Sequence, residues 1–540
     1  MSSRLTAPAL ARRQLRLITA NPAWTPARRA PPPAAAAASM SRRLAILSHH
    51  LAPPPSSSRP AYSSRPSPPT PQQPSVLTKT DGNLRSLTLN RPEALNALNM
   101  EMIQAIAAEL TKWENSEPAK MVILKGVGRA FCAGGDVVSL IKSVASEDSA
   151  QRKTPVDFFR AEYTLDSFIA KMSTPVVCFL DGITMGGGMG LSMHTPFRIA
   201  TEKTRVAMPE TAIGLFPDVG ASFFLPRLDG ELGTYLGLTG TSLYGWGAFQ
   251  AGIASHYVPS SSLAALEDRL SALSADATHD RINDAINEFA ADPEESSSSS
   301  PAFDLQGTKR QAIDHCFGQN TVEKIVEQLE AVRDGHLFSE DPALKSWAEQ
   351  TIDLILIRSP SSCKITLMAL REGKKMSIDE CFAMEMRMAA TCCDVQTHPD
   401  FVTGVTHLLV NKQKSRPAWS PSELSEVKLP EITAQYFSSQ PASSTHVVRL
   451  DSLSPTRIQS YHDYPYANYG LPSEETIKNL VIGNVKGTSG HLAITAPELH
   501  EMVSQKWNHK VGVAQKLDDI LARRTTRKGQ NEGFVLKWQY

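Results

Sequence analysis

Two acidic residues, Glu210 and Asp218, stand eight positions apart in the stretch MPETAIGLFPDVG, residues 208–220. The apolar residues and prolines around them are typical of a half-buried segment, in which an unused carboxylate is costly. Two carboxyl groups in an apolar setting acquire different pKa values, so one can act as a nucleophile or base while the other manages a proton or orients a ligand. A turn cap and a surface charge are the structural alternative for these two acids.

Glycine clusters follow two strand-like segments of the sequence. FCAGGD (131–136) comes after MVILK (121–125), and DGITMGGGMG (181–190) comes after VVCFL (176–180). At such turns no Cβ blocks a ligand, and backbone N–H groups at the start of a helix attract negative charge. Two such groups aimed at one point would form an oxyanion hole for a thioester or ester carbonyl. Tight turns or phosphate loops are the alternatives, although neither cluster has the spacing of a nucleotide-binding motif.

The elements that would position these groups alternate between strands and helices. LRSLTLN (84–90) sets leucines on one face and then stops at Pro92, which predicts a strand. NMEMIQAIAAELTKW (99–113) begins with an N-cap asparagine and has apolar residues at helical spacing. A second helix is expected over about residues 155–172. Together with the strands named above, this alternation of strands and helices predicts a mixed α/β core.

The composition limits the kinds of protein that the chain can be. Its 540 residues are 41% hydrophobic, which is ample for a large core, and no apolar run approaches the roughly 18 residues of a membrane span. The 7 cysteines include no C-x-x-C pair and no spacing typical of zinc, so we expect reduced thiols and no metal. Adjacent Cys392 and Cys393 could be a redox pair, but two small buried residues on one helix are the commoner explanation.

The N-terminal segment differs sharply from the rest of the chain. Its first 70 residues contain ten arginines, no lysine and no acid, with many alanines, serines and prolines. We predict a mitochondrial transit peptide or linker over residues 1–74 and a location in the matrix; a disordered basic arm is the alternative. Without those arginines the chain has 45 basic and 55 acidic residues, which argues against a large nucleic-acid-binding surface.

Four segments taken in order resemble the crotonase, or enoyl-CoA hydratase/isomerase, superfamily: NRPEALNALN (90–99), FCAGGD, DGITMGGGMG and MPETAIGLFPDVG. The resemblance implies an α/β fold built as a spiral of ββα repeats over residues 75–257, with a helical region over 258–420 that closes the active site. It also implies that Gly135 and Gly187 donate the two amides of an oxyanion hole to an acyl-CoA thioester. CoA is then part of the substrate, and no separate cofactor is expected.

One departure from the hydratases narrows this resemblance. Their first catalytic glutamate falls on Gly190 here, so half of the acid/base pair that adds water to a double bond is missing. FFRAEY (158–163) and FPDVGASFFLPR (216–227) are instead similar to the 3-hydroxyisobutyryl-CoA hydrolases of valine degradation. An enoyl-CoA isomerase or hydratase that works with Glu210 alone is the alternative.

The hydrolase resemblance assigns roles to individual residues. It matches four of them to substrate-binding or catalytic positions: Glu162, Gly187, Glu210 and Asp218. Glu210 would attack the thioester or activate water, and Asp218 would orient the substrate or manage protons. Glu162 would bind the hydroxyl of the acyl group.

Residues 421–540 extend beyond what a plain hydrolase needs. They include YHDYPYANYGLP (461–472), helical patterns over 492–506 and 513–524, and a basic end, RRTTRK (523–528). Such a tail is typical of a segment that binds a partner. It resembles the extension on a hydrolase-like subunit of the fungal mitochondrial small ribosomal subunit, which makes that subunit a candidate partner. An arm that wraps the parent fold, or a homo-oligomer contact, is the alternative.

Overall fold

The computed structural model describes residues 73–144, 153–273, 277–293, 303–338, 341–438, 453, 458–484, 494–528 and 535–539. The chain divides into two units at Pro71, and all of the described residues belong to the second, Gln72–Tyr540. The expected transit peptide therefore lies outside the described residues, apart from its last two positions. No helix in the described ranges combines the length and apolarity needed to cross a membrane.

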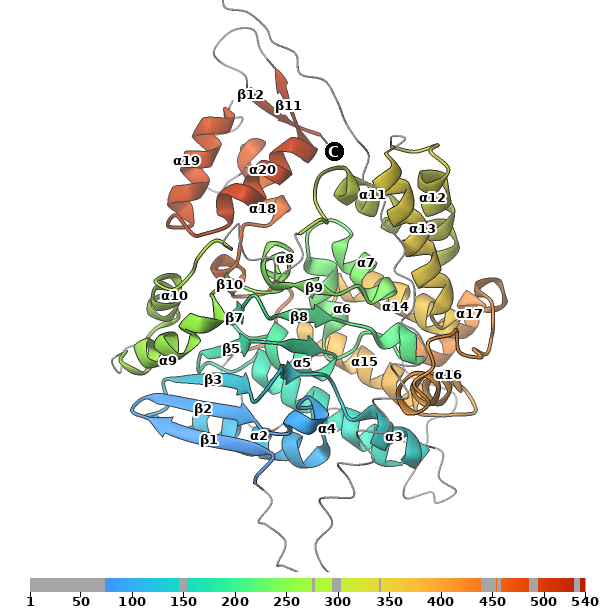
Figure 1. The fold of residues 1–540 in the computed structure, drawn as a ribbon, viewed down its shortest axis with the longest axis horizontal. Helices are drawn as coiled ribbons and strands as arrows, with labels where there is room; N and C mark the ends of the chain where they lie inside the picture. Colours follow the sequence, from blue (N-terminus) through green and yellow to red (C-terminus); the bar gives the residue numbers. More distant parts are fainter. Residues whose placement is uncertain are drawn as a thin grey trace, which may run out of the picture. The chain divides into compact units, whose positions relative to one another are not determined.

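Two sheets form the core (Figure 1). The larger has the order β1 (Val76–Asp81), β2 (Leu84–Leu89), β3 (Met121–Gly126), β5 (Val176–Leu180), β7 (Phe197–Ala200) and β10 (His256–Tyr257). The smaller has the order β4 (Ala130–Cys132), β6 (Ile183–Met185), β8 (Arg205–Ala207) and β9 (Leu243–Tyr244). Among the described strands of these two sheets, β1 and β9 run antiparallel to their neighbours and the other pairs are parallel. Strands β3, β5 and β7 are each followed by a strand of the smaller sheet, which is the expected spiral.

Helices α2 (Met100–Glu114), α3 (Val137–Val144), α4 (Thr154–Ala170) and α5 (Gly187–Met193) complete the first turns of the spiral. Asn99 caps α2 by accepting a hydrogen bond from the Met102 amide, as its sequence predicted. Helix α4 contacts both α2 and α5. The predicted strands over 84–90, 121–125 and 176–180 and both predicted helices are confirmed within two residues.

Helices dominate the chain after β8. They are α6 (Ala221–Phe224), α7 (Leu232–Thr239), α8 (Gly245–Gln250), α9 (Leu263–Ser271), α10 (His279–Asn287), α11 (Gly307–Phe317), α12 (Val322–Arg333), α13 (Pro342–Ile357), α14 (Pro360–Gly373), α15 (Ile378–Cys392), α16 (Asp400–Val405) and α17 (Leu429–Ile432). Helix α15 packs on α4 and α6, and α16 packs on the short 3₁₀ turn η3 (Glu210–Ile213).

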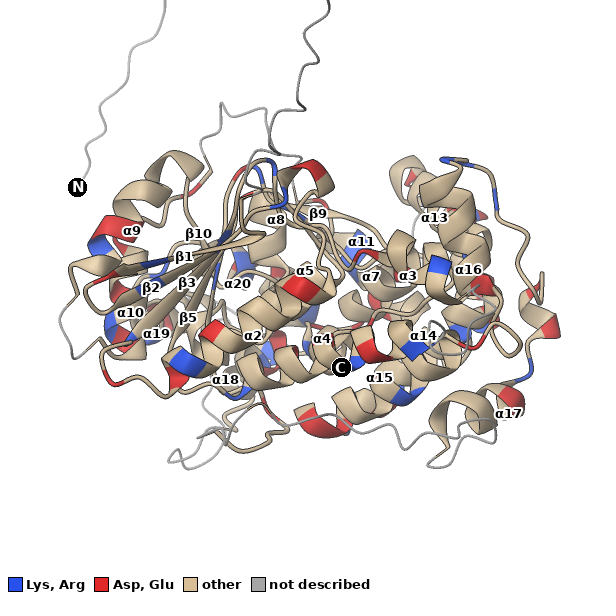
Figure 2. Cartoon of the chain, turned by 90° about the horizontal axis from the view of Figure 1, so that it is seen from below, with Lys and Arg blue, Asp and Glu red and all other residues tan. Residues whose placement is uncertain are grey.

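All seven cysteines are buried and unpaired, including Cys392 and Cys393. In Figure 2, Lys and Arg are interspersed with Asp and Glu over the visible helices.

The C-terminal extension is a folded part of the same unit. It contains α18 (Glu474–Val481), α19 (Ala496–Lys506), α20 (Val513–Arg524), β11 (Thr525–Lys528) and β12 (Val535–Trp538). Its apolar residues, among them Leu499, Leu517 and Trp538, form one cluster with Phe249 and Tyr257 of the core. Burial of this shared surface holds the extension on the parent fold.

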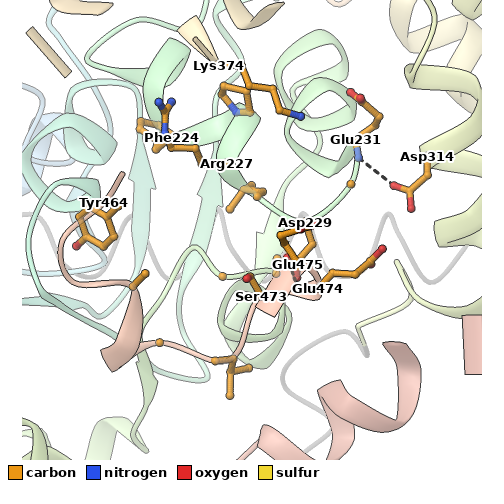
Figure 3. A pocket seen from close by; sticks show the side chains of 18 of the residues that line it. Phe224, Arg227, Asp229, Glu231, Asp314, Lys374, Tyr464, Ser473, Glu474 and Glu475 are labelled. Atoms are coloured by element: carbon orange, nitrogen blue, oxygen red, sulfur yellow. Dashed lines mark hydrogen bonds between the residues drawn. The ribbon is translucent and has the colours of Figure 1, made fainter. Parts of the chain in front are cut away.

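Ion pairs reinforce the seam between extension and core. Arg524 pairs with Glu474 at 2.5 Å and with Asp314 of α11 at 2.7 Å, and Lys516 pairs with Asp229 at 2.8 Å. These residues line a cavity of about 1400 Å³ between the two parts. Figure 3 shows Asp229, Asp314 and Glu474 in its wall. Arg524, in the basic end 523–528, therefore uses its charge within the fold. The same holds for Arg523, which pairs with Glu474 at 3.1 Å.

Candidate active site

Helix α4 brings two carboxylates to one buried face. Glu162 and Asp166 are four positions apart, so they lie on the same side of the helix, and their exposed fractions are 2% and 0%. The intervening Tyr163 points its hydroxyl at Asp218 and donates a hydrogen bond of 2.7 Å. Because Asp218 follows η3, this bond ties the helix to the segment that also carries Glu210.

The two glycine turns lie against one another beside these acids. A parallel bridge pairs Leu98 with Gly135, in which Leu98 donates to Gly134 and Asp136 donates to Leu98, both at 2.8 Å. In this pattern the amide of Gly135 itself points away from Leu98. Gly187 is the first residue of α5, so its amide has no acceptor within the helix. A Cβ built on Gly134 would lie 3.8 Å from the Gly187 nitrogen, which shows how closely the turns approach.

Glu162 and Glu210 flank these turns from two sides. A Cβ built on Gly187 would lie 2.2 Å from Oε1 of Glu162, and one built on Gly186 would lie 3.0 Å from Oε1 of Glu210. Oε1 of Glu162 and Oε2 of Glu210 are buried without a hydrogen-bond partner in the described part of the chain. Buried carboxyl oxygens usually have hydrogen-bond partners, so these two oxygens are candidate contacts for a substrate or a water molecule.

The acids differ in their affinity for protons. Burial raises the pKa of Glu162 and of Glu210 well above the ordinary value, and the charge of Asp218 raises both further. Burial also raises the pKa of Asp218, but the hydrogen bond from Tyr163 opposes this effect and the value is about 6. Asp218 is therefore the charged member at neutral pH, while the glutamates hold protons more tightly.

The loop after Asp218 is held from two directions. Val219 and Gly220 have φ angles of 54° and 86°, and such a conformation is unfavourable for a β-branched residue. Glu385 of α15 accepts hydrogen bonds from the amides of Gly220 and Ser222 at 2.6 and 2.8 Å. From the opposite direction, His194 contacts the carbonyl of Val219 through Nε2 at 2.9 Å. His194 thus has the structural hydrogen bond expected of a core histidine.

Gly190 leaves room for an acid from another helix. A Cβ built on Gly190 would lie 2.4 Å from Oδ2 of Asp166 and 2.7 Å from Cβ of Val219. Neither carboxyl oxygen of Asp166 has a hydrogen-bond partner among the described residues. Burial raises the pKa of Asp166 well above the ordinary value, and the charge of Glu162 adds to the effect. Asp166 was not among the sequence-predicted site residues.

The structure brings all of the sequence-predicted site residues to one region: Glu162, Gly135, Gly187, Glu210 and Asp218. Sequence reasoning missed Tyr163, Asp166 and Glu385. The first two could have been found from their place beside Glu162 on one helix, whereas Glu385 reaches the site only through packing of α15. The described residues contain no group of three or more His, Cys, Asp and Glu side chains arranged to hold a metal ion.

The fold and the paired glycine turns define a crotonase-type protein, and comparison with known families agrees. The model of the enoyl-CoA hydratase/isomerase family matches residues 84–437, so the chain belongs to this family. A solved structure described as a carnitinyl-CoA dehydratase from Mycobacterium thermoresistibile is 34% identical, with a TM-score of 0.58 over 68% of this chain and 97% of that one. The predicted superfamily and fold are confirmed.

Two kinds of characterised relative are equally similar in sequence. The chain is 41% identical over 364 residues to the mitochondrial 3-hydroxyisobutyryl-CoA hydrolase of Homo sapiens, which is 67% of this chain and 88% of that protein. It is also 41% identical over 467 residues to the small ribosomal subunit protein mS47 of Neurospora crassa, which is 85% of this chain and 87% of that protein. The second match is longer by about 100 residues.

Proposed function

We propose that this chain hydrolyses an acyl-CoA thioester in the mitochondrial matrix, with 3-hydroxyisobutyryl-CoA as the first candidate substrate. The observation that carries the proposal is the pair of buried, unpartnered carboxyl oxygens, on Glu162 and Glu210, beside two glycine turns. Similarity to mitochondrial 3-hydroxyisobutyryl-CoA hydrolases supports the choice of substrate and compartment.

The thioester carbonyl would lie between the glycine turns. Its oxygen would accept hydrogen bonds from the amides of Gly135 and Gly187, which stabilise the negative charge that develops during attack. Glu210 would then either attack the carbonyl carbon and form an anhydride, or take a proton from an attacking water. In both routes the carbon–sulfur bond breaks, water supplies the oxygen of the acid product, and CoA leaves as a thiol. Both routes use the ionised form of Glu210, and its raised pKa makes this carboxylate a stronger base.

The other acids would bind and orient the acyl group. Glu162 lies beside Gly187 and would contact the hydroxyl of the substrate, and Asp218 would keep a negative charge that favours protonation of its neighbours. Gly190 offers no side chain for a second water-activating group, which disfavours hydration of a double bond as the main reaction. An enoyl-CoA isomerase that uses Glu210 alone remains the alternative within this family.

The test is release of CoA thiol from 3-hydroxyisobutyryl-CoA by the purified full-length chain. We expect Glu210→Gln to abolish release, because the amide can neither attack the carbonyl nor accept a proton. Glu109→Gln, on the surface of α2, is the matched control and should be fully active. Undiminished release by Glu210→Gln would rule out this mechanism, and absence of release by the unmodified chain would rule out the substrate.

A role in the small subunit of the mitochondrial ribosome is the second candidate. It is favoured by the match to mS47, which is longer by about 100 residues and covers 85% of this chain, against 67% for the hydrolase. The two functions are compatible, since the family match over residues 84–437 contains the carboxylate cluster and leaves most of the extension outside it. Cosedimentation of the tagged chain with mitochondrial small subunits would support the second role. Sedimentation only as a free protein would contradict it.

A further inference from the structure

The C-terminal extension contacts the segment that follows α5. The hydroxyl of Tyr464 donates a hydrogen bond to the carbonyl of Thr195 at 2.5 Å and accepts one from Nη1 of Arg198 at 2.7 Å. Arg198 also donates to Thr195 at 2.6 Å, and its guanidinium carbon lies 5.4 Å from the centre of the Tyr464 ring. Three residues therefore form a closed network that joins residues 458–471 to the segment after α5.

That segment belongs to the structure that holds Asp218. Thr195 directly follows His194, and His194 is the C-cap of α5, the helix that begins at Gly187. The ring of His194 contacts the carbonyl of Val219, the residue after Asp218. A continuous path of hydrogen bonds and one peptide link thus leads from Tyr464 to the loop that carries a candidate catalytic acid.

The loop needs such support because its conformation is strained. Val219 has a φ of 54°, and a β-branched residue keeps this conformation only when its surroundings enforce it. Glu385 and His194 hold the residues after Asp218, and Tyr163 holds the Asp218 carboxylate. Because Thr195 is joined to His194 by one peptide link, we expect a shift of Thr195 to weaken the contact between His194 and Val219.

We propose that Tyr464 is a positioning residue for the reaction, which acts through Thr195 and His194 to hold Asp218 in place; this inference rests on the proposed hydrolase function. Tyr464 lies beyond residue 437, where the match to the family model ends. The extension then has a second task besides any contact with a partner, because it completes the support of the site.

The test compares two tyrosines of the same segment in the full-length chain. Tyr464→Phe removes only the hydroxyl, and we expect kcat to fall about three- to tenfold with KM unchanged, since geometry is disturbed and no substrate contact is lost. Tyr466→Phe is the control, because it keeps the Tyr466 ring, which stacks on His279 at 5.1 Å and packs edge-on against Tyr464 at 5.7 Å between centroids. It should leave kcat unchanged. Equal activity of the Tyr464→Phe variant and the unmodified chain would overturn the proposal.

A double-mutant cycle tests the path itself. If Tyr464 acts through His194, then Tyr464→Phe should cause no further loss of kcat in a chain that already carries His194→Phe. If the loss of kcat in the double variant equals the product of the losses in the two single variants, Tyr464 acts independently of His194 and the proposal is overturned.

Amide hydrogen exchange separates this inference from the proposed function. We expect Tyr464→Phe to increase exchange over residues 214–222, and Tyr466→Phe to leave it unchanged, whether or not the chain hydrolyses the chosen thioester. If Tyr464→Phe leaves exchange unchanged, the positioning role of Tyr464 is refuted even if the chain hydrolyses the thioester. If exchange is faster but the chain releases no CoA, the positioning role stands and only the hydrolase function is refuted.

Discussion

The hydroxyl of Tyr163 donates a hydrogen bond of 2.7 Å to the carboxylate of Asp218. Burial raises the pKa of Asp218, and this bond lowers it, so that the carboxylate ionises with a pKa of about 6. The bond therefore favours the charged form of Asp218 at neutral pH. It also separates Asp218 from the two glutamates, which burial keeps protonated to higher pH.

The pH dependence of hydrolysis should report this bond. Because Asp218 works as a carboxylate, kcat/KM should show a downward break as the pH falls through about 6. Tyr163→Phe removes a donor that stabilises the charged form, so the pKa of Asp218 rises and the break moves to higher pH. The measurement is the profile of both chains, with Tyr235→Phe as a buried control. A break that stays in place or moves to lower pH would contradict the assignment.

Asp166 should make stability depend on pH. The pKa of Asp166 is raised in the folded state. Its contribution to the free energy of unfolding is therefore fully present below the pKa of the unfolded state, and it is lost as the pH rises through the pKa of the folded state. Asp166→Asn carries no charge at any pH, and it should raise the unfolding free energy by about 1 kcal/mol or more at alkaline pH, with less effect under acidic conditions. The measurement is thermal unfolding at both pH values. Asp353→Asn is the control, because Asp353 is an exposed residue of α13. An effect of Asp166→Asn that does not depend on pH would exclude this account.

A methyl group at Gly187 should damage the site without unfolding the chain. The new Cβ would lie 2.2 Å from Oε1 of Glu162, so Glu162 must move or the amide of residue 187 must turn away. Loss of one oxyanion donor typically lowers kcat about 100-fold or more, and we expect a loss of this size for Gly187→Ala. Gly237→Ala in α7 is the control, because its nearest atoms are side-chain ends at 3.3 Å or more. Full activity of Gly187→Ala would show that this amide does not bind the carbonyl.

The extension should loosen when Glu474 loses its charge. Glu474 is buried between Arg523 and Arg524, and its removal leaves both guanidinium groups without this partner. Breaking a buried pair typically costs about 3 kcal/mol, so Glu474→Gln should lower the melting temperature and speed amide exchange in α19 and α20. Glu475→Gln is the control, because its partner Lys478 lies on the exposed side of α18. If both variants behave alike, the ion pairs do not hold the extension.

Local patterns predicted the first half of the fold well. The N-cap Asn99, the strands over 84–90 and 176–180, and the turn glycines each carry their own signal, because capping, alternation and positive φ depend on neighbouring residues. The site was predictable as far as it resembles a known family. The roles proposed for Glu162, Glu210 and Asp218 stay predictions until activity is measured.

What the sequence could not reveal depends on contacts between distant segments. Glu385 meets Gly220 across 165 positions, and Arg524 meets Asp314 across 210. No periodicity or spacing indicates such partners, so the sequence could not show that two arginines of the basic end 523–528 pair within the fold. The same reason hid Tyr464, whose partner Thr195 lies 269 positions earlier.

The burial of every cysteine has a practical consequence. In the folded state all seven thiols are shielded from solvent, and burial raises the pKa of Cys132 and Cys178 to about 12, so few reactive thiolates form there. A disulfide reagent that turns coloured with free CoA would therefore meet almost no competing signal from the intact protein. With the same reagent, unfolding would appear as a sudden excess of seven thiol equivalents per chain. A single assay can therefore distinguish turnover from unfolding.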